Sequence, residues 1–289
     1  MNSLKTVFVL GAPRSGTSMI LYMLINDQPD FFGSKHESKF YTIALKKPFV
    51  ESTFLNDDYF NELLGEEVIK SIFSTSKDHF EFFNKAMNYC REKSGSPIFV
   101  EKSPMHTVYY KDIPKRFPDV GLVLINRHPA ANIQSIAFTK WINLMSDKFP
   151  LGISKNIYVR YLFASLLFHE YWRDSKKIEK DPRTIITICY EDVILEKNDL
   201  RAQMSKAFGI EFNPLYVSRP FSNAVSHTKE GFDKDRVNGY KQSMPKSVQY
   251  FIKAVFTPEN SIDFIVRIPF LLFFFEPVYY IKKYLMGKK

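Results

Sequence analysis

The chain has 289 residues, of which 45% are hydrophobic, 16% aromatic and 25% charged. This composition excludes a disordered or collagen-like chain and supplies enough apolar side chains for one large α/β domain. Forty lysines and arginines stand against thirty-one aspartates and glutamates, and the resulting net charge of +9 favours an anionic partner such as a phosphorylated ligand, an acidic lipid surface or a nucleic acid.

Short apolar segments alternate along the chain with longer segments of helical periodicity. Nearly continuous apolar runs are typical of parallel strands that are covered on both faces, and their alternation with helices predicts βαβ crossovers. The sequence therefore predicts an α/β fold with a doubly wound parallel sheet and flanking helices. In chain order, the expected elements are a strand at Thr6–Leu10, helices at Thr17–Asn26, Tyr59–Ile72 and Lys77–Lys93, strands at Pro97–Val100 and Val120–Asn126, helices at Ala130–Trp141 and Tyr158–Lys180, and a strand at Thr184–Tyr190.

The segment from about Phe32 to Ser96 carries no strong strand signal. We interpret it as a helical excursion from the sheet edge, with residues 36–96 forming a cap over a substrate cleft. No internal repeat and no linker-like stretch interrupts the chain, so a single domain over residues 1–289 is expected.

Two cysteines, Cys90 and Cys189, cannot form a disulfide framework and do not have the spacing of metal ligands. We expect Cys189, which lies in an apolar run, to be buried. The apolar segment Thr6–Leu10 is too short for a secretory signal peptide. These features predict a reducing, cytoplasmic compartment.

The most informative segment is Gly11-Ala12-Pro13-Arg14-Ser15-Gly16-Thr17-Ser18, between the first strand and the first helix. Such a turn directs successive backbone N–H groups toward one point at the positive end of a helix, which suits a phosphate. Its glycine spacing is that of a Walker A loop and predicts a sheet of the P-loop nucleotide-binding type. However, Thr17 replaces the lysine that contacts the β- and γ-phosphates of a nucleoside triphosphate. An ordinary strand-to-helix turn is the alternative interpretation.

A second candidate anion site follows the strand at Val120–Asn126. Arg127 ends this strand, Pro129 suits the first position of a helix, and Ser135 follows eight residues after Arg127. A guanidinium can donate two charge-assisted hydrogen bonds to a phosphate, and a hydroxyl can add a third. The alternative interpretation is that Arg127 is a surface cation and that Ser135 is a helix residue that binds no ligand.

Together, the two segments resemble the sulfotransferases that use 3′-phosphoadenosine 5′-phosphosulfate (PAPS). Glu101-Lys102-Ser103-Pro104 and Tyr190-Glu191-Asp192 are similar to the bacterial and tyrosylprotein-type branch of this family, and a fainter similarity occurs at Arg236–Lys241. The resemblance implies transfer of a sulfuryl group from PAPS to an acceptor hydroxyl or amine, with release of adenosine 3′,5′-bisphosphate. It implies no metal.

The resemblance also implies roles for individual residues. The phosphate loop would hold the 5′-phosphosulfate, Arg127 and Ser135 the 3′-phosphate, and Tyr190 and Lys241 would contact the cofactor. Arg14 and Lys102 are the candidates for neutralising charge on the leaving oxygen. The predicted loop ligands are Gly11, Pro13, Arg14, Ser15, Gly16, Thr17 and Ser18.

The general base is expected shortly after the first helix, where the family has a glutamate. Glu37 occupies this place and is our choice, with His36 as the alternative. The family usually has a lysine directly before the glutamate, whereas His36 intervenes here after Lys35. An imidazole already has a pKa near neutrality, whereas a glutamate needs burial to reach it.

The C-terminal segment, residues 257–289, is apolar and ends in lysines. A spanning helix needs about 20 apolar residues, and two prolines and two charged side chains interrupt this stretch. Two interpretations remain open: a buried or dimer-packing helix, and an interfacial segment whose lysines meet anionic lipid.

Three other functions remain as alternatives. A P-loop nucleotide kinase would share the fold but needs the lysine that Thr17 replaces. A non-catalytic basic protein that binds nucleic acid would explain the charge, although we find no motif that reads RNA or DNA. A family member that binds PAPS without turnover is the third. For the sulfotransferase, we expect a glycan, glycolipid or small hydroxylated metabolite as acceptor.

Overall fold

The computed structural model describes residues 4–139, 157–215, 227–228, 231–232 and 237–256. The chain divides into two compact units, Met1–Tyr240 and Lys241–Lys289. The predicted single domain therefore stays a prediction. The C-terminal segment at residues 257–289 lies outside the described residues.

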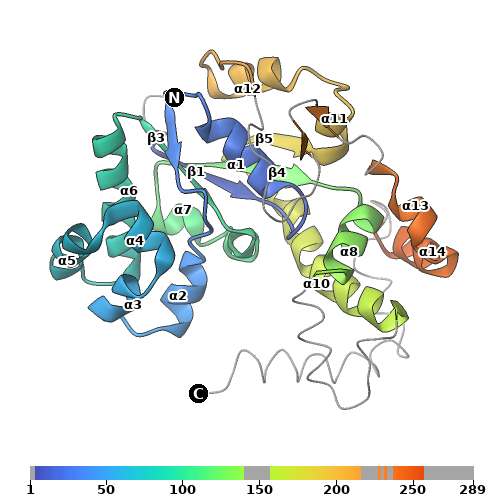
Figure 1. Ribbon diagram of the computed structural model, residues 1–289, viewed down its shortest axis with the longest axis horizontal. Coiled ribbons are helices and arrows are strands. Elements are labelled where there is room, and N and C mark those ends of the chain that lie inside the picture. The colour runs from blue at the N-terminus through green and yellow to red at the C-terminus, as the bar shows by residue number, and fades with distance from the viewer. Residues whose placement is uncertain (1–3, 140–156, 216–226, 229–230, 233–236, 257–289) are drawn as a thin grey trace. The chain divides into compact units, whose positions relative to one another are not determined.

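Five parallel strands form the sheet of the first unit, in the order β2-β3-β1-β4-β5 (Figure 1). This arrangement confirms the predicted doubly wound parallel sheet of the P-loop type. In register, Val9 of β1 lies beside Lys102 of β3 and Val123 of β4. The strands are β1 (Thr6–Leu10), β2 (Phe31–Gly33), β3 (Ile98–Lys102), β4 (Val120–Asn126) and β5 (Thr184–Cys189).

The strand β2 was not expected from the sequence. It has only three residues and pairs with β3 alone, so no apolar run of ordinary strand length marks it. Close packing against β3 explains the glycine at its end, because a Cβ on Gly33 would lie 2.5 Å from the carbonyl oxygen of Val100.

The helices of the first unit mostly follow the predicted periodicity. The helix expected at Tyr59–Ile72 is two helices, because Gly65 adopts a φ of 80° and ends one helix where the next begins. A helix was expected at Ala130–Trp141; α8 ends at Ala137, and residues 140 and 141 lie outside the described residues. The helices are α1 (Thr17–Ile25), α2 (Phe40–Lys46), α3 (Glu51–Leu55), α4 (Asp58–Leu64), α5 (Glu66–Ser74), α6 (His79–Ser94), the 3-10 helix η1 (Pro104–Tyr109), α7 (Ile113–Arg116), α8 (Pro129–Ala137), α10 (Ile157–Ile178), α11 (Tyr190–Ile194) and α12 (Leu200–Phe208).

The remaining described elements are short. A two-stranded antiparallel ladder joins β6 (His227–Thr228) to β7 (Gly231–Phe232). The second unit contains α14 (Lys246–Val255) and most of α13 (Tyr240–Ser243).

The sheet separates two hydrophobic cores because successive strand residues face opposite sides. Val7 and Val9 of β1 pack with α1, α11 and α12, whereas Phe8 and Leu10 pack with the helices between β2 and β3. The strand β5 is only half-buried because it lies at the sheet edge, and Cys189 at its end is exposed rather than buried as expected.

The helices α2 to α6 form a compact group beside β3 (Figure 1). Aromatic stacking holds this group together: the rings of Phe40 and Phe83 lie 4.1 Å apart, and those of Phe54 and Phe82 lie 3.8 Å apart. The predicted helical excursion is thereby confirmed as helical, whereas its role as a substrate cap stays a prediction. Within the described residues, no helix has the length and apolarity needed to cross a membrane.

Candidate functional site

All five strands contribute a predicted site segment to the same edge of the sheet. Because the strands are parallel, their carboxyl ends meet at this edge, where open α/β sheets bind ligands. In spatial order, the segments contain Glu37 after β2, Lys102 at the end of β3, the phosphate loop after β1, Arg127 after β4 and Tyr190 after β5.

The phosphate loop has the backbone of an anion cradle. Gly11 and Gly16 adopt φ angles of 154° and 105°, and Arg14 adopts 69°. A Cβ on Gly11 would lie 2.6 Å from the carbonyl oxygen of Ile125, and one on Gly16 would lie 2.7 Å from the Tyr190 ring. Both positions therefore exclude a side chain for steric as well as conformational reasons.

The start of α1 also suits a phosphate. Gly16 occupies the N-cap of this helix, and no described side chain accepts a hydrogen bond from its first turn. Ser15 is 1% exposed, and its hydroxyl has no hydrogen-bond partner among the described residues. An anion held in the loop would give this hydroxyl a partner, so the residues present fit a phosphate group.

Thr107 fixes the first residue of the loop. Its Oγ1 accepts a hydrogen bond from the Gly11 N–H at 2.8 Å and donates one to the Gly11 carbonyl at 3.0 Å. Thr107 lies on η1 and is fully buried. Sequence reasoning missed this residue, since a threonine 96 positions away in the chain carries no recognisable signal.

The second junction meets the first through direct contacts. Arg127 Nη1 donates to the carbonyl of Arg14 at 2.9 Å, and Arg14 Nε donates to Ser135 Oγ at 3.2 Å. The Arg127 guanidinium also lies 4.4 Å from the centroid of the Tyr190 ring, a cation–π contact. The structure thus brings together four predicted cofactor ligands, Arg14, Arg127, Ser135 and Tyr190, from three strand-to-helix junctions.

Glu191 and His128 complete this side of the site. Glu191 Oε1 accepts a hydrogen bond from the backbone N–H of His128 at 3.0 Å, which fixes the start of α8. The His128 ring stacks on Tyr240 at 4.9 Å. Lys241 follows as the first residue of the second unit, so its contact with the cofactor stays a prediction.

On the other side of the loop, Glu37 and Lys102 form an ion pair. Lys102 Nζ lies 2.8 Å from Glu37 Oε1, and the lysine side chain is 3% exposed whereas the glutamate is 37% exposed. His36, the alternative base, points elsewhere: its Nε2 lies 2.9 Å from Glu62 Oε2, and both side chains are exposed.

A buried carboxylate, Glu101, lies behind this ion pair. Its oxygens accept hydrogen bonds from Ser38 at 2.5 Å, Ser103 at 3.0 Å and Tyr59 at 2.9 Å. Burial raises the pKa of Glu101 to about 7, although these hydrogen bonds oppose the rise. Sequence reasoning assigned no role to this residue, although a glutamate directly after an apolar run was a usable signal.

His106 lies next to Glu101 in the interior. Its Nδ1 is 3.6 Å from Glu101 Oε1, too far for a hydrogen bond, and burial lowers the pKa of His106 to about 3. The histidine is therefore a neutral ring that packs against Phe8 and Tyr41.

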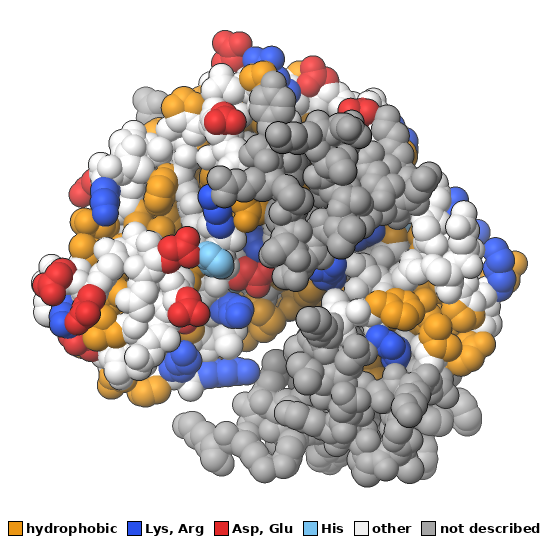
Figure 2. Space-filling view, in the orientation of Figure 1, with side chains coloured by type: hydrophobic (Ala, Val, Ile, Leu, Met, Phe, Trp, Pro, Cys, Tyr) orange, Lys and Arg blue, Asp and Glu red, His pale blue; other side chains and the backbone are white. Residues whose placement is uncertain are grey.

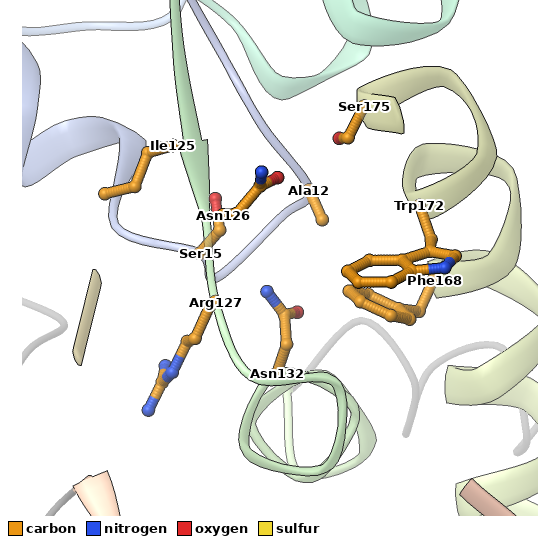
Figure 3. Close-up of a pocket in the computed structure, with 9 residues that line it drawn as sticks. All are labelled: Ala12, Ser15, Ile125, Asn126, Arg127, Asn132, Phe168, Trp172 and Ser175. Atoms are coloured by element: carbon orange, nitrogen blue, oxygen red, sulfur yellow. The ribbon is translucent and has the colours of Figure 1, made fainter. Parts of the chain in front are cut away.

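A small pocket lies between the loop, the start of α8 and α10 (Figure 3). Asn132 points into it toward Ala12 and Ser15, Trp172 lines the opposite wall, and Arg127 points away. Asn132 is fully buried, and neither atom of its amide has a hydrogen-bond partner among the described residues. Sequence reasoning did not single out this asparagine.

The charged side chains of the visible face do not form one continuous basic surface. Figure 2 shows Asp and Glu side chains among the Lys and Arg side chains. Among the described residues, no group of three or more His, Cys, Asp and Glu side chains is arranged to hold a metal ion.

Comparison with known proteins places this geometry in context. The sulfotransferase family model matches residues 6–214. The sulfotransferase domain from the curacin biosynthetic pathway is similar with a TM-score of 0.57 and 17% identity, over 86% of this chain and 96% of that domain. The sulfotransferase domain of the Synechococcus PCC 7002 olefin synthase is similar with a TM-score of 0.55 and 14% identity, over 86% of this chain and 92% of that domain. No curated protein sequence matches significantly.

Proposed function

The chain belongs to the sulfotransferase family, and from this membership we propose that it transfers a sulfuryl group from PAPS to an acceptor hydroxyl by in-line displacement. Adenosine 3′,5′-bisphosphate is the second product. As acceptor we propose a glycan, a glycolipid or a small hydroxylated metabolite. The partly exposed ring of Trp172 beside the loop suits packing against a sugar or an apolar metabolite.

One observation carries this proposal: two strand-to-helix junctions, each a candidate anion site, contact each other. Arg127 of the second junction donates to the Arg14 carbonyl of the first, and Arg14 donates to Ser135 of the second. A ligand with two anionic groups on one adenosine needs two such sites within the length of a single molecule. A nucleoside 5′-phosphate alone needs only the loop.

The chain's own residues have distinct tasks in binding. The N–H groups at the start of α1 and the hydroxyls of Ser15, Thr17 and Ser18 bind the 5′-phosphosulfate. Arg127 and Ser135 bind the 3′-phosphate, with the Tyr190 ring keeping the Arg127 guanidinium in place. When bound, PAPS supplies the sulfuryl group.

For the proton transfer we propose Glu37, with His36 as the alternative. Glu37 is half-buried at the edge where the strands end, whereas His36 pairs with Glu62 on the exterior. Acceptance of a proton by Glu37 cancels its charge and weakens its attraction to Lys102. The lysine ammonium is then available, together with Arg14, to stabilise negative charge on the leaving oxygen.

Two other functions share some of these features. A nucleotide kinase needs a lysine at the position of Thr17, which is 4% exposed and carries no charge. A nucleic-acid-binding protein needs a basic stripe or patch, and the visible face mixes both signs of charge (Figure 2).

Ligand-induced stabilisation distinguishes these functions. We expect adenosine 3′,5′-bisphosphate to raise the melting temperature without Mg²⁺, and ATP with Mg²⁺ to have a smaller effect. Radiolabelled PAPS is then incubated with a panel of hydroxylated acceptors, and label in a product identifies the substrate. Stabilisation by ATP and Mg²⁺ alone would favour the kinase, and nucleotide binding without any labelled product would indicate a member that has lost turnover.

We further propose that the enzyme works in the cytoplasm and that residues 257–289 contact anionic membranes peripherally. The sequence has only two cysteines, too few for a disulfide framework, and this favours a reducing compartment. Sedimentation with phosphatidylserine vesicles tests the contact, which should be lost on truncation after residue 257. Equal sedimentation of the full and truncated chains would refute it.

A further inference from the structure

Two short segments of the site lie against each other residue by residue. Glu37 contacts Lys102 through their side chains, at 2.8 Å. The next residue, Ser38, donates to Glu101 Oε1 at 2.5 Å, and the backbone N–H of Lys39 donates to Ser103 Oγ at 3.0 Å. The segment 37–39 is thereby fixed against the segment 101–103 at three successive positions.

Ser38 connects these contacts between segments 37–39 and 101–103 to the helices α2 to α6. Its hydroxyl donates to Glu101 and accepts the backbone N–H of Phe40, the first residue of α2, at 3.2 Å. Lys39, between them, adopts a left-handed φ of 48°. A lysine in this conformation is strained, so the surrounding hydrogen bonds must hold it there.

Glu101 accepts hydrogen bonds from three hydroxyls at this place. Its Oε1 accepts from both Ser38 and Ser103, and its Oε2 accepts from Tyr59 of the cap helix α4. The side chain is 1% exposed and cannot touch a substrate. A buried charge is poorly suited to stability alone, because a well-packed apolar residue often serves as well or better.

We propose that Glu101 is a positioning residue, which holds Glu37 and Lys102 in register through the hydroxyls of Ser38 and Ser103. This inference rests on the proposed function, in which Glu37 accepts the acceptor's proton and Lys102 stabilises the leaving oxygen. Glu37 is half-exposed at the site, Lys102 is buried beside it, and the residues that neighbour both are anchored in the interior. Placement of a base within a fraction of an ångström is worth large factors in rate.

Hydrogen bonds favour the charged form of Glu101, whereas its burial favours the neutral form. The groups that face Glu101 are the hydroxyls of Ser38, Tyr59 and Ser103, the Lys102 ammonium and the neutral His106 ring. All three hydroxyls donate to the carboxylate form. Protonation of Glu101 would turn one acceptor oxygen into a donor, so one hydroxyl would have to turn away.

The first test removes single hydroxyls. We expect S38A to lower kcat about tenfold, with little change in the affinity for adenosine 3′,5′-bisphosphate measured by calorimetry. S96A is the matched control, because Ser96 also donates one hydrogen bond, to the Pro29 carbonyl at 2.9 Å, but lies away from the site. A kcat for S38A equal to that of S96A would overturn the inference.

A double-mutant cycle tests whether Glu101 acts through Glu37. We expect E101Q to lower kcat about tenfold in the wild-type background and to have almost no further effect on E37Q. Y59F loses a contact on the cap side only, and we expect it to lower kcat less than S38A. If the effects of E101Q and E37Q on kcat were fully additive, the inference would be overturned, because a merely structural residue lowers kcat by the same factor in both backgrounds.

A structural measurement separates this inference from the proposed function. Absence of any labelled product with the wild-type enzyme would refute the proposed function. The positioning role is then decided by crystal structures of the wild type and E101Q. Loss of the Glu37–Lys102 contact in E101Q would support it, and an unchanged contact would overturn it.

Discussion

Thr107 binds both backbone polar groups of Gly11, accepting from its N–H at 2.8 Å and donating to its carbonyl at 3.0 Å. This pair of hydrogen bonds joins the phosphate loop after β1 to η1 after β3. The shape of the loop thus depends on a residue that belongs to none of the recognised motifs.

Replacement of Thr107 by valine should therefore weaken both stability and nucleotide binding. Valine has nearly the same shape but leaves two buried groups of Gly11 without partners, and we expect a loss of about 2 kcal/mol in the free energy of unfolding. We also expect about tenfold weaker binding of adenosine 3′,5′-bisphosphate in calorimetry. T107S keeps the hydroxyl and should retain most of the stability and of the nucleotide affinity. Equal stability and affinity of T107V and wild type would contradict the role of Thr107 in holding the loop.

Gly16 offers a test of the close contact between the loop and Tyr190. In G16A, the new Cβ would lie 2.7 Å from the Tyr190 ring, at a backbone φ of 105°. We expect this variant to lose nucleotide binding and to melt at a lower temperature. G95A is the control, because Gly95 also has a positive φ, of 71°, but no atom within 4 Å of the new methyl group. Similar nucleotide affinities of the two variants would show that the contact is unimportant.

Arg127 should distinguish between nucleotides with and without a 3′-phosphate. We expect R127A to bind adenosine 3′,5′-bisphosphate at least tenfold more weakly than wild type, because a forked, charge-assisted contact is lost. Binding of adenosine 5′-monophosphate should change much less. R127K tests the geometry, since an ammonium keeps the charge but not the fork. Equal losses for both nucleotides in R127A would place Arg127 at the 5′-phosphate or in the support of the loop instead.

The general base is tested by comparing E37Q with H36A. We expect E37Q to lower kcat by about 10² to 10⁴, the usual contribution of a positioned base. H36A should have a much smaller effect, because His36 is exposed and paired with Glu62. A larger loss of kcat in H36A than in E37Q would assign the proton transfer to His36. An unchanged kcat in both variants would exclude both residues as the base.

The raised pKa of Glu101 predicts a pH dependence of stability. Folding raises this pKa from 4.5 to about 7, so the stabilisation is fully present below pH 4.5 and is lost as the pH rises through 7. E101Q lacks this titration. We expect urea unfolding to show wild type losing stability relative to E101Q between pH 5 and pH 8, by up to about 3 kcal/mol.

His106 titrates in the opposite sense but does not disturb this comparison. Because its pKa is lowered to about 3, the folded state binds fewer protons than the unfolded state at mildly acidic pH. The residue is common to both proteins, so its contribution largely cancels in the difference. Parallel stability profiles for wild type and E101Q would mean that Glu101 does not titrate near neutrality.

The sequence predicted the elements whose signals are local. The strands β1, β3 and β4 are nearly continuous apolar runs, and the loop at residues 11–18 has glycines at positions where the backbone or its neighbours exclude a side chain. Gly65 divided a helix that periodicity predicted as one, because a positive φ is decided by a single residue. The strand β2 was missed because three residues are too few to form a pattern.

The site residues also divide into those that a local motif predicted and those that only the fold brought together. Arg14, Arg127, Ser135 and Tyr190 were found as motif members, but their mutual contacts follow from the strand order, which no motif contains. Thr107 and Ser38 were not found, because a single hydroxyl-bearing residue outside a motif carries no sequence signal.

By itself, the amino-acid sequence determined the parallel α/β architecture and the phosphate loop, because apolar periodicity and glycine spacing act over a few residues. Only the tertiary structure decided that Glu37 faces Lys102 while His36 turns to Glu62, and that Glu101 is buried beneath three hydroxyls. Apart from the contact between Ser103 and Glu101, these relationships join residues 26 to 65 positions apart in the chain. Burial and charge take effect only when the packed sheet brings such residues within hydrogen-bonding distance.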